Sequence, residues 1–132
     1  MADKGGVIGI YDLPYLTASP KQPELSDYMD HMTHALKICG EDHVGIGRDA
    51  AVQSFDTSPE AMKEFQRELA ERRAKGVNAP GEDRPLYVIG LNVPNRCEII
   101  ADALLQRHYP ARVAEKVLGG NFVRAFRDIW KT

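Results

Sequence analysis

Short apolar runs alternate with helical stripes along this chain. Two runs, at residues 7–11 and 43–49, are rich in valine, isoleucine and glycine, which is typical of buried β-strands. Between them, residues 25–38 carry apolar side chains at spacings of three and four, and Gly40 follows, which predicts an amphipathic helix with a glycine stop. This order of strand, helix and strand predicts a βαβ unit, in which parallel strands are joined by a right-handed crossover.

Helical signals dominate the second half of the chain. Ser58-Pro59-Glu60 combines a cap, a first-turn proline and a first-turn acid, and it predicts the start of a helix that runs to about Lys75. A third short strand is expected over residues 87–91. Apolar spacing and flanking helix breakers predict three more helices, at residues 96–107, 110–118 and 122–130.

The predicted strands are too few for a complete parallel sheet. Such a sheet normally has both faces covered and neighbours beside each strand, and a two-stranded sheet alone is marginal. Gly5-Gly6 is typical of a helix C-terminus, and that helix would lie upstream of Met1. Residues 12–23 contain three prolines and are expected to be non-helical. The sequence therefore predicts one partial domain, residues 1–132, cut at the N-terminal side of a larger α/β protein.

Composition narrows the function classes. Of the 132 residues, 43% are hydrophobic and 27% are charged, which is ordinary for a soluble globular protein. A net charge of −2 gives no electrostatic footprint for nucleic acid, and no apolar run approaches a membrane span. Cys39 and Cys97 form no CxxC pair and are expected to be reduced structural thiols. Together with the lack of a signal-peptide pattern, these features favour a cytoplasmic protein.

Asp49 is the leading candidate for chemistry. It ends the second predicted strand, and in α/β folds the loops after strand ends line the active-site crevice. A single carboxylate there can act as an acid or base, or it can simply cap a turn, and composition alone favours the cap. His31 and His34 stand at a spacing that can bind a metal ion, but a partly buried histidine with one hydrogen bond and a solvated neighbour explains them better. We expect His43 and His108 to be surface or capping residues and Arg72 and Arg73 to lie on a solvated helix face.

Three segments resemble the membrane (renal) dipeptidase family, whose members are zinc-dependent dipeptidases built on a TIM (β/α)8 barrel. Gly5-Gly6-Val7-Ile8-Gly9-Ile10 resembles the seventh barrel strand of that family. The stretch that begins at Asp30-His31-Met32-Thr33-His34 and continues through Glu41-Asp42-His43-Val44-Gly45-Ile46-Gly47-Arg48-Asp49 resembles its helix and eighth strand. Leu118-Gly119-Gly120-Asn121-Phe122-Val123-Arg124-Ala125-Phe126 resembles its closing helix. The order and spacing of these segments fit the family over nearly all of the chain.

The resemblance implies a specific role for one residue. Asp49 matches the family's strand-eight aspartate, which binds the metal-bridging water and shuttles its proton. The family's zinc ligands lie on the first six strands and have no counterpart here, so the resemblance implies no metal site in this chain and no zinc bound to it alone. The family often continues Asp-Phe-Asp-Gly, whereas this chain reads Asp49-Ala50-Ala51-Val52, which leaves a pocket role for that loop open. Tyr11, Asp12 and Tyr15 are expected near the barrel mouth, without an assigned contact.

The sequence leaves two functional interpretations. In the first, the chain is the C-terminal part of a metallodipeptidase, which hydrolyses dipeptides only in the intact barrel and with Asp49 as its catalytic residue. In the second, it is a non-catalytic interaction module derived from a truncated barrel. The expected partners are a dipeptide in the intact enzyme and either a second copy of this chain or a complementary N-terminal chain. Unpaired strand edges and apolar helix stripes favour such oligomers.

Overall fold

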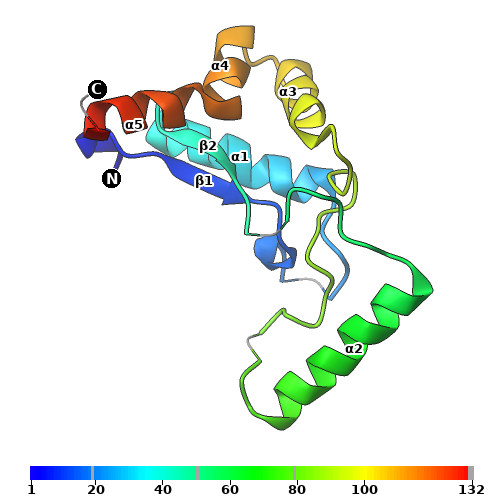
Figure 1. Ribbon diagram of the computed structural model, residues 1–132. Helices are drawn as coiled ribbons and strands as arrows, with labels where there is room; N and C mark the ends of the chain where they lie inside the picture. The colour runs from blue at the N-terminus through cyan, green and yellow to red at the C-terminus, as the bar shows by residue number, and fades with distance from the viewer. Residues whose placement is uncertain (19, 50, 79, 131–132) are drawn as a thin grey trace.

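The computed structural model describes residues 1–18, 20–49, 51–78 and 80–130. Its described elements include two β-strands, five α-helices and three short helical turns of 3-10 or π type. In chain order they are η1 (Ala2–Lys4), β1 (Ile8–Tyr11), η2 (Pro14–Leu16), α1 (Leu25–Cys39), β2 (Val44–Gly47), α2 (Pro59–Ala74), α3 (Arg96–Gln106), α4 (Ala111–Glu115), η3 (Lys116–Gly120) and α5 (Asn121–Trp130). Figure 1 shows β1 and β2 side by side, with α1 packed along them.

The two strands form the predicted parallel pair. Ile8 is opposite Val44 and Tyr11 is opposite Gly47, so both strands end at the same edge of the sheet. Glycine is required in β2, because a Cβ atom on Gly45 would collide with the ring of Phe122 in α5. A Cβ atom on Gly9 would likewise lie 3.0 Å from the Gly47 Cα atom. The glycines that alternate with isoleucine and valine therefore let backbone and aromatic side chain approach the sheet closely.

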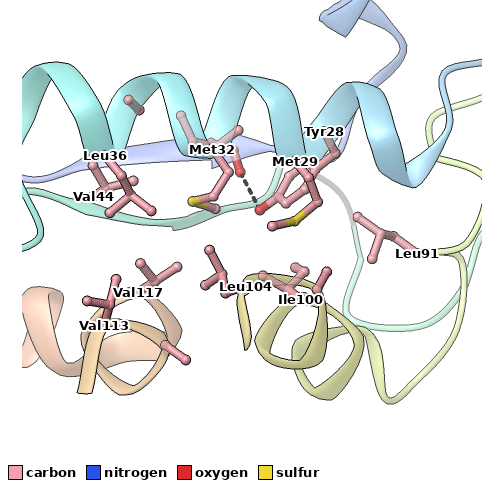
Figure 2. Close-up of a cluster of buried hydrophobic side chains, with 14 of the residues drawn as sticks. Tyr28, Met29, Met32, Leu36, Val44, Leu91, Ile100, Leu104, Val113 and Val117 are labelled. Atoms are coloured by element: carbon pink, nitrogen blue, oxygen red, sulfur yellow. Dashed lines mark hydrogen bonds between the residues drawn. The ribbon is translucent and has the colours of Figure 1, made fainter. Parts of the chain in front are cut away.

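The core lies between α1 and the C-terminal helices. The predicted stripe of α1 is buried, and Figure 2 shows it facing side chains from α3, α4 and η3 across the cluster. The α1 helix begins with a reciprocal capping box between Glu24 and Asp27 and ends at Gly40, whose φ of 83° favours glycine. The core side chains from these helices and from β2 include Tyr28, Met29, Met32, Leu36, Val44, Ile100, Leu104, Val113 and Val117.

The C-terminal helix α5 is held to the sheet by polar contacts. The buried side chain of Asn121 donates to the carbonyls of Glu41 and Val44, each at 2.8 Å. Arg124 donates to the carbonyls of Gly5 and Asp42 at 3.3 and 2.8 Å. The break expected at residues 119–121 is present, since Gly119 has a non-helical backbone at the junction of η3 and α5. The apolar stripe of α5 is largely exposed.

The α2 helix belongs to a segment that stands away from the sheet (Figure 1). This segment, residues 55–78 and 80–87, is called the excursion. Ser58 caps α2 as expected, with its hydroxyl accepting from the Ala61 N–H at 3.3 Å, and Pro59 opens the first turn of the helix. Leu69 is its buried residue, and much of the remaining surface is charged and exposed. An aromatic cluster joins the two ends of the excursion to α2, with the centroid of the Phe55 ring 6.0 Å from that of Phe65 and 5.7 Å from that of Tyr87.

Two local predictions were wrong, and a third is untested. Residues 87–91 form no strand: Ile89 makes only an isolated bridge with Glu24, and Gly90 has a φ of 91°, which turns the chain. Gly5 ends the short turn η1 in the left-handed conformation, so it closes a single 3-10 turn, and the helix expected upstream of Met1 stays a prediction. The proline-rich loop contains the single 3-10 turn η2, because Pro14 occupies its first position, where no N–H donor is needed.

Candidate functional site

Asp49 lies two residues beyond the end of β2 and its side chain is exposed. Asp12 follows the end of β1 directly, at the same edge of the sheet. Parallel pairing brings the residue after Tyr11 close to the residue after Gly47, and the carboxylate of Asp12 accepts a charge-assisted hydrogen bond from Arg48. The carboxyl end of this sheet therefore carries two aspartates, one after each strand, in very different environments.

Asp12 is buried while Asp49 is exposed. Burial raises the pKa of the Asp12 carboxyl, and the positive charges of Arg48 and Arg96 counteract part of that increase. Tyr28 lies beneath this cluster and donates to the Ile10 carbonyl at 3.3 Å; burial, with the nearby Asp12 charge, raises the pKa of its phenol. Tyr28 is therefore neutral, and Asp12 is an internal partner for arginine rather than a solvent-facing catalytic group.

Arg48 and Arg96 hold the loop that follows Asp49. Arg48 donates to the carbonyls of Ala51 at 2.8 Å and Gln53 at 3.3 Å. Arg96, at the start of α3, donates to the carbonyls of Val52 at 2.9 Å and Leu91 at 3.1 Å. Three successive loop carbonyls are thus bound by two guanidinium groups, which restricts the backbone beside the candidate carboxylate. Within the described ranges, Asp12 Oδ1 and Arg96 Nη2 are buried without a hydrogen-bond partner.

A pocket of about 180 Å³ opens beside Asp49. Tyr15, from the loop after β1, lies in its wall, and the α2 excursion closes the opposite side. An ion pair joins Arg72 of α2 to Glu82, with 2.8 Å between Arg72 Nη2 and the carboxylate. The side chains that line the pocket with Asp49 are Leu13, Tyr15, Phe65, Arg72, Glu82 and Leu86.

The histidines are dispersed over the fold. His31 is exposed, rather than partly buried, and its Nε2 lies 2.7 Å from the Leu16 carbonyl oxygen; His34 is exposed. His43 Nδ1 lies 2.8 Å from the Gly6 carbonyl oxygen, which joins the starts of the two strands. His108 takes a left-handed conformation with a φ of 64° just after α3, as befits a capping position. Over the part of the chain that the structure describes, no group of three His, Cys, Asp or Glu side chains could hold a metal ion.

A comparison with protein families shows to which family the chain belongs. The sequence model of membrane dipeptidase, peptidase family M19, matches residues 1–78, which include both strands and Asp49. The chain belongs to this family. Asp12, Tyr15, Arg48 and Arg72 fall within the matched region, whereas Glu82, Leu86 and Arg96 lie beyond it.

Two individual proteins are similar over nearly the whole chain. Dipeptidase tcpJ of Claviceps purpurea (strain 20.1) is 26% identical over 125 residues, which cover 94% of this chain and 22% of that protein. The solved structure of an amidohydrolase from Pseudomonas aeruginosa superposes with a TM-score of 0.71 and 26% identity, covering 99% of this chain and 38% of the other. The chain thus spans about a fifth of the curated relative that it matches and well under half of the solved structure.

The sequence pointed to Asp49 and left the rest of the site unassigned. Tyr15 lines the same pocket as Asp49, while Tyr11 has its ring against Gly47 and is half exposed; their place near a barrel mouth stays a prediction. Arg72 does not lie on a purely solvated face, because it is paired with Glu82. Arg48 and Arg96 were not predicted to be site residues. The signals for them in the sequence are an arginine beside a strand end and an arginine at the start of a helix. Among the described helices, none is long and apolar enough to cross a bilayer.

Proposed function

We propose that this chain is the C-terminal portion of a dipeptide-hydrolysing (β/α)8 barrel and that Asp49 transfers protons in the reaction. In this proposal β1 and β2 are the seventh and eighth barrel strands, and residues 1–132 form one partial domain. The M19 match over residues 1–78 and the superposition on the amidohydrolase support it. The observation that carries it is the position of Asp49, exposed at the carboxyl end of β2, beside a pocket and on a loop bound by two arginines.

The carboxylate of Asp49 is suited to both halves of a hydrolytic proton transfer. As water attacks the peptide carbonyl, one Asp49 oxygen accepts the proton that the water loses. Asp49 then donates that proton to the amine nitrogen as the carbon–nitrogen bond breaks, so the amine leaves neutral and the carboxylate is restored. Zinc chemistry is implied by the family, but the described residues do not fit a zinc site, so no metal contact is assigned to them.

The proposal is tested in an assembled barrel. We would join this chain to the matching N-terminal portion of the Pseudomonas aeruginosa amidohydrolase and compare Asp49→Asn with the parent for kcat, zinc content and melting temperature. Because an amide cannot accept the water's proton, we expect kcat to fall about 10²–10⁴-fold with zinc content unchanged. The matched control is Asp56→Asn, since Asp56 accepts from the Ser58 N–H at 2.8 Å and only stabilises a turn. Equal turnover in all three proteins would remove the catalytic role of Asp49.

A second candidate, a self-associating module without catalysis, is favoured by the exposed apolar stripe of α5. Val123, Phe126, Ile129 and Trp130 are 44–69% exposed, and within the described ranges β1 and β2 pair only with each other. Size-exclusion chromatography with the separate N-terminal portion added distinguishes the two candidates. A barrel fragment should form a heterocomplex and restore dipeptide hydrolysis, whereas an independent module should remain a homo-oligomer without activity.

A further inference from the structure

The pocket beside Asp49 is built by two segments that are far apart in the sequence. Leu13 and Tyr15 come from the loop after β1, and Glu82 and Leu86 come from the segment that follows α2. The α2 helix itself adds Phe65 and Arg72. The excursion therefore forms one wall of the pocket, and the loop after β1 forms the other.

Hydrogen bonds hold these two walls together. The buried side chain of Arg84 donates to the carbonyls of Lys21 at 2.9 Å and Thr17 at 3.1 Å. Gln22 donates from the opposite segment to the carbonyls of Pro85, at 2.8 Å, and Tyr87. These bonds run in both directions between the two segments. They join Arg84, Pro85 and Tyr87 to Thr17, Lys21 and Gln22, and so they fix the excursion to the loop after β1.

Tyr15 packs closely against the excursion. Gly81 has a φ of 86°, and a Cβ atom there would lie 3.2 Å from the Tyr15 ring, so glycine allows the contact. Burial raises the pKa of the Tyr15 phenol, and the Glu82 charge adds to the increase, which keeps this side chain neutral. The ring of Tyr15 thus presents a neutral face to the pocket.

The lining of the pocket selects a class of ligand. Leu13, Phe65, Leu86 and the Tyr15 ring supply apolar contact surface. Arg72 and Glu82 already neutralise each other at 2.8 Å and require no counter-charge from a ligand. With that pair neutral, the Asp49 carboxylate disfavours an acidic group in the ligand. An apolar cavity of about 150 Å³ is large enough for benzene, so a volume of about 180 Å³ accommodates a branched aliphatic or single-ring side chain.

We propose that this pocket binds one uncharged aliphatic or aromatic side chain of the dipeptide and makes the α2 excursion a specificity-determining element. The inference rests on the proposed function, because it places a substrate side chain beside Asp49. It adds a substrate class, dipeptides with a bulky apolar residue, and it assigns Leu86, Phe65 and Tyr15 to the contact surface of that residue.

The pocket is tested first on the 132-residue chain itself, since every residue of its lining belongs to this chain. The methyl groups of labelled leucines are followed by NMR during titration with N-acetyl-leucinamide and N-acetyl-phenylalaninamide. The acidic probe is N-acetyl-aspartic acid α-amide, whose side-chain carboxylate is free. We expect saturable shifts of the Leu13 and Leu86 methyl groups by the two apolar probes, with affinities of about millimolar typical of such small ligands. The acidic probe should bind at least about tenfold more weakly.

Filling the pocket provides the matched pair of variants. Leu86→Trp, with Leu86→Phe as the smaller substitution in case the indole disturbs folding, should abolish binding of both apolar probes. Leu105→Trp makes the same change on an exposed position of α3 and should leave binding intact. Absence of saturable shifts in the folded parent, or equal binding of the acidic probe, would overturn the inference.

Kinetics in the assembled barrel separate this inference from the proposed function. Leu86→Trp should lower kcat/KM for Leu-Gly or for Gly-Leu about 10–100-fold more than it lowers kcat/KM for Gly-Gly, because the lost contact is with a single side chain. Hydrolysis with an unchanged preference for leucine would overturn the pocket and leave the proposed function standing. Probe binding without hydrolysis of any dipeptide would overturn the proposed function, and with it the assignment of this pocket to a dipeptide side chain.

Discussion

Helices α1 and α5 both carry an apolar stripe, but the stripe of α1 is buried and the stripe of α5 is exposed. The stripe of α1 is covered, with Tyr28, Met29 and Met32 wholly buried against the strands and α3. The stripe of α5 is open, with Phe126 44% and Trp130 67% exposed and their rings stacked at 4.9 Å between centroids. A periodic apolar stripe therefore predicts that a helix needs a packing partner on that face. Whether the partner is present depends on the width of the sheet beside the helix.

The largest expected effect is a difference between the two stripes in their contribution to stability. Met32→Ala should lower the free energy of unfolding by about 2–5 kcal/mol, because it leaves a cavity in the core. Phe126→Ala should change it by less than about 1 kcal/mol, because the ring is 44% exposed and stacks on the rings of Phe122 and Trp130 of the same helix. Urea unfolding of both variants at one protein concentration measures the difference. Equal losses would mean that α5 is covered in solution, for example by a second copy of the chain.

A smaller effect is expected at the polar anchor of α5. Asn121→Ala removes two donors and leaves the carbonyls of Glu41 and Val44 without that partner, so stability should fall by about 1–3 kcal/mol. Hydrogen exchange should then speed up in α5 before it does in α1. Arg127→Ala, an exposed change on the same helix, should stay within about 0.5 kcal/mol. If Asn121→Ala matched this control, the apolar contacts of α5 alone would hold it to the sheet.

The smallest effect concerns the ion pairs that join the turn before β2 to η3. Lys116 lies 2.7 Å from the carboxylates of both Glu41 and Asp42, and its hydrogen bonds lower the pKa of these carboxyls below their ordinary values of 4.5 and 3.8. A pKa lowered by folding gives stability that is present above the unfolded-state pKa and lost as pH falls through the folded-state pKa.

The corresponding measurement is the melting temperature as a function of pH. Between about pH 6 and pH 3, the parent should lose slightly more thermal stability than Lys116→Met. Salt at about 1 M should reduce the difference, because these groups are exposed to solvent and are screened. Identical pH profiles for the two proteins at low salt would show that the ion pairs contribute nothing measurable, as is common for surface pairs.

Local patterns were sufficient for much of the secondary structure. The stripe of α1, the Ser58-Pro59-Glu60 start of α2 and the break at Gly119 each act within one or two helical turns, and the structure has all three features. The strand expected at residues 87–91 is absent for a nonlocal reason: the Tyr87 carbonyl accepts from the side chain of Gln22 and the Ile89 N–H donates to the Pro23 carbonyl, so the backbone does not pair with a neighbouring strand.

By itself the sequence determined the two strands, the helix that joins them and the placement of Asp49 after the second strand, because each of these depends on residues close together in the chain. Only the tertiary structure decided that Asp12 is buried against Arg48, that Arg96 binds the Asp49 loop, and that Arg72 and Glu82 close a pocket beside it. The Asp12–Arg48 and Arg96–Val52 contacts join residues 36 and 44 positions apart. Their formation depends on how the excursion and α3 pack against the sheet edge, and no periodicity within a single segment encodes that packing.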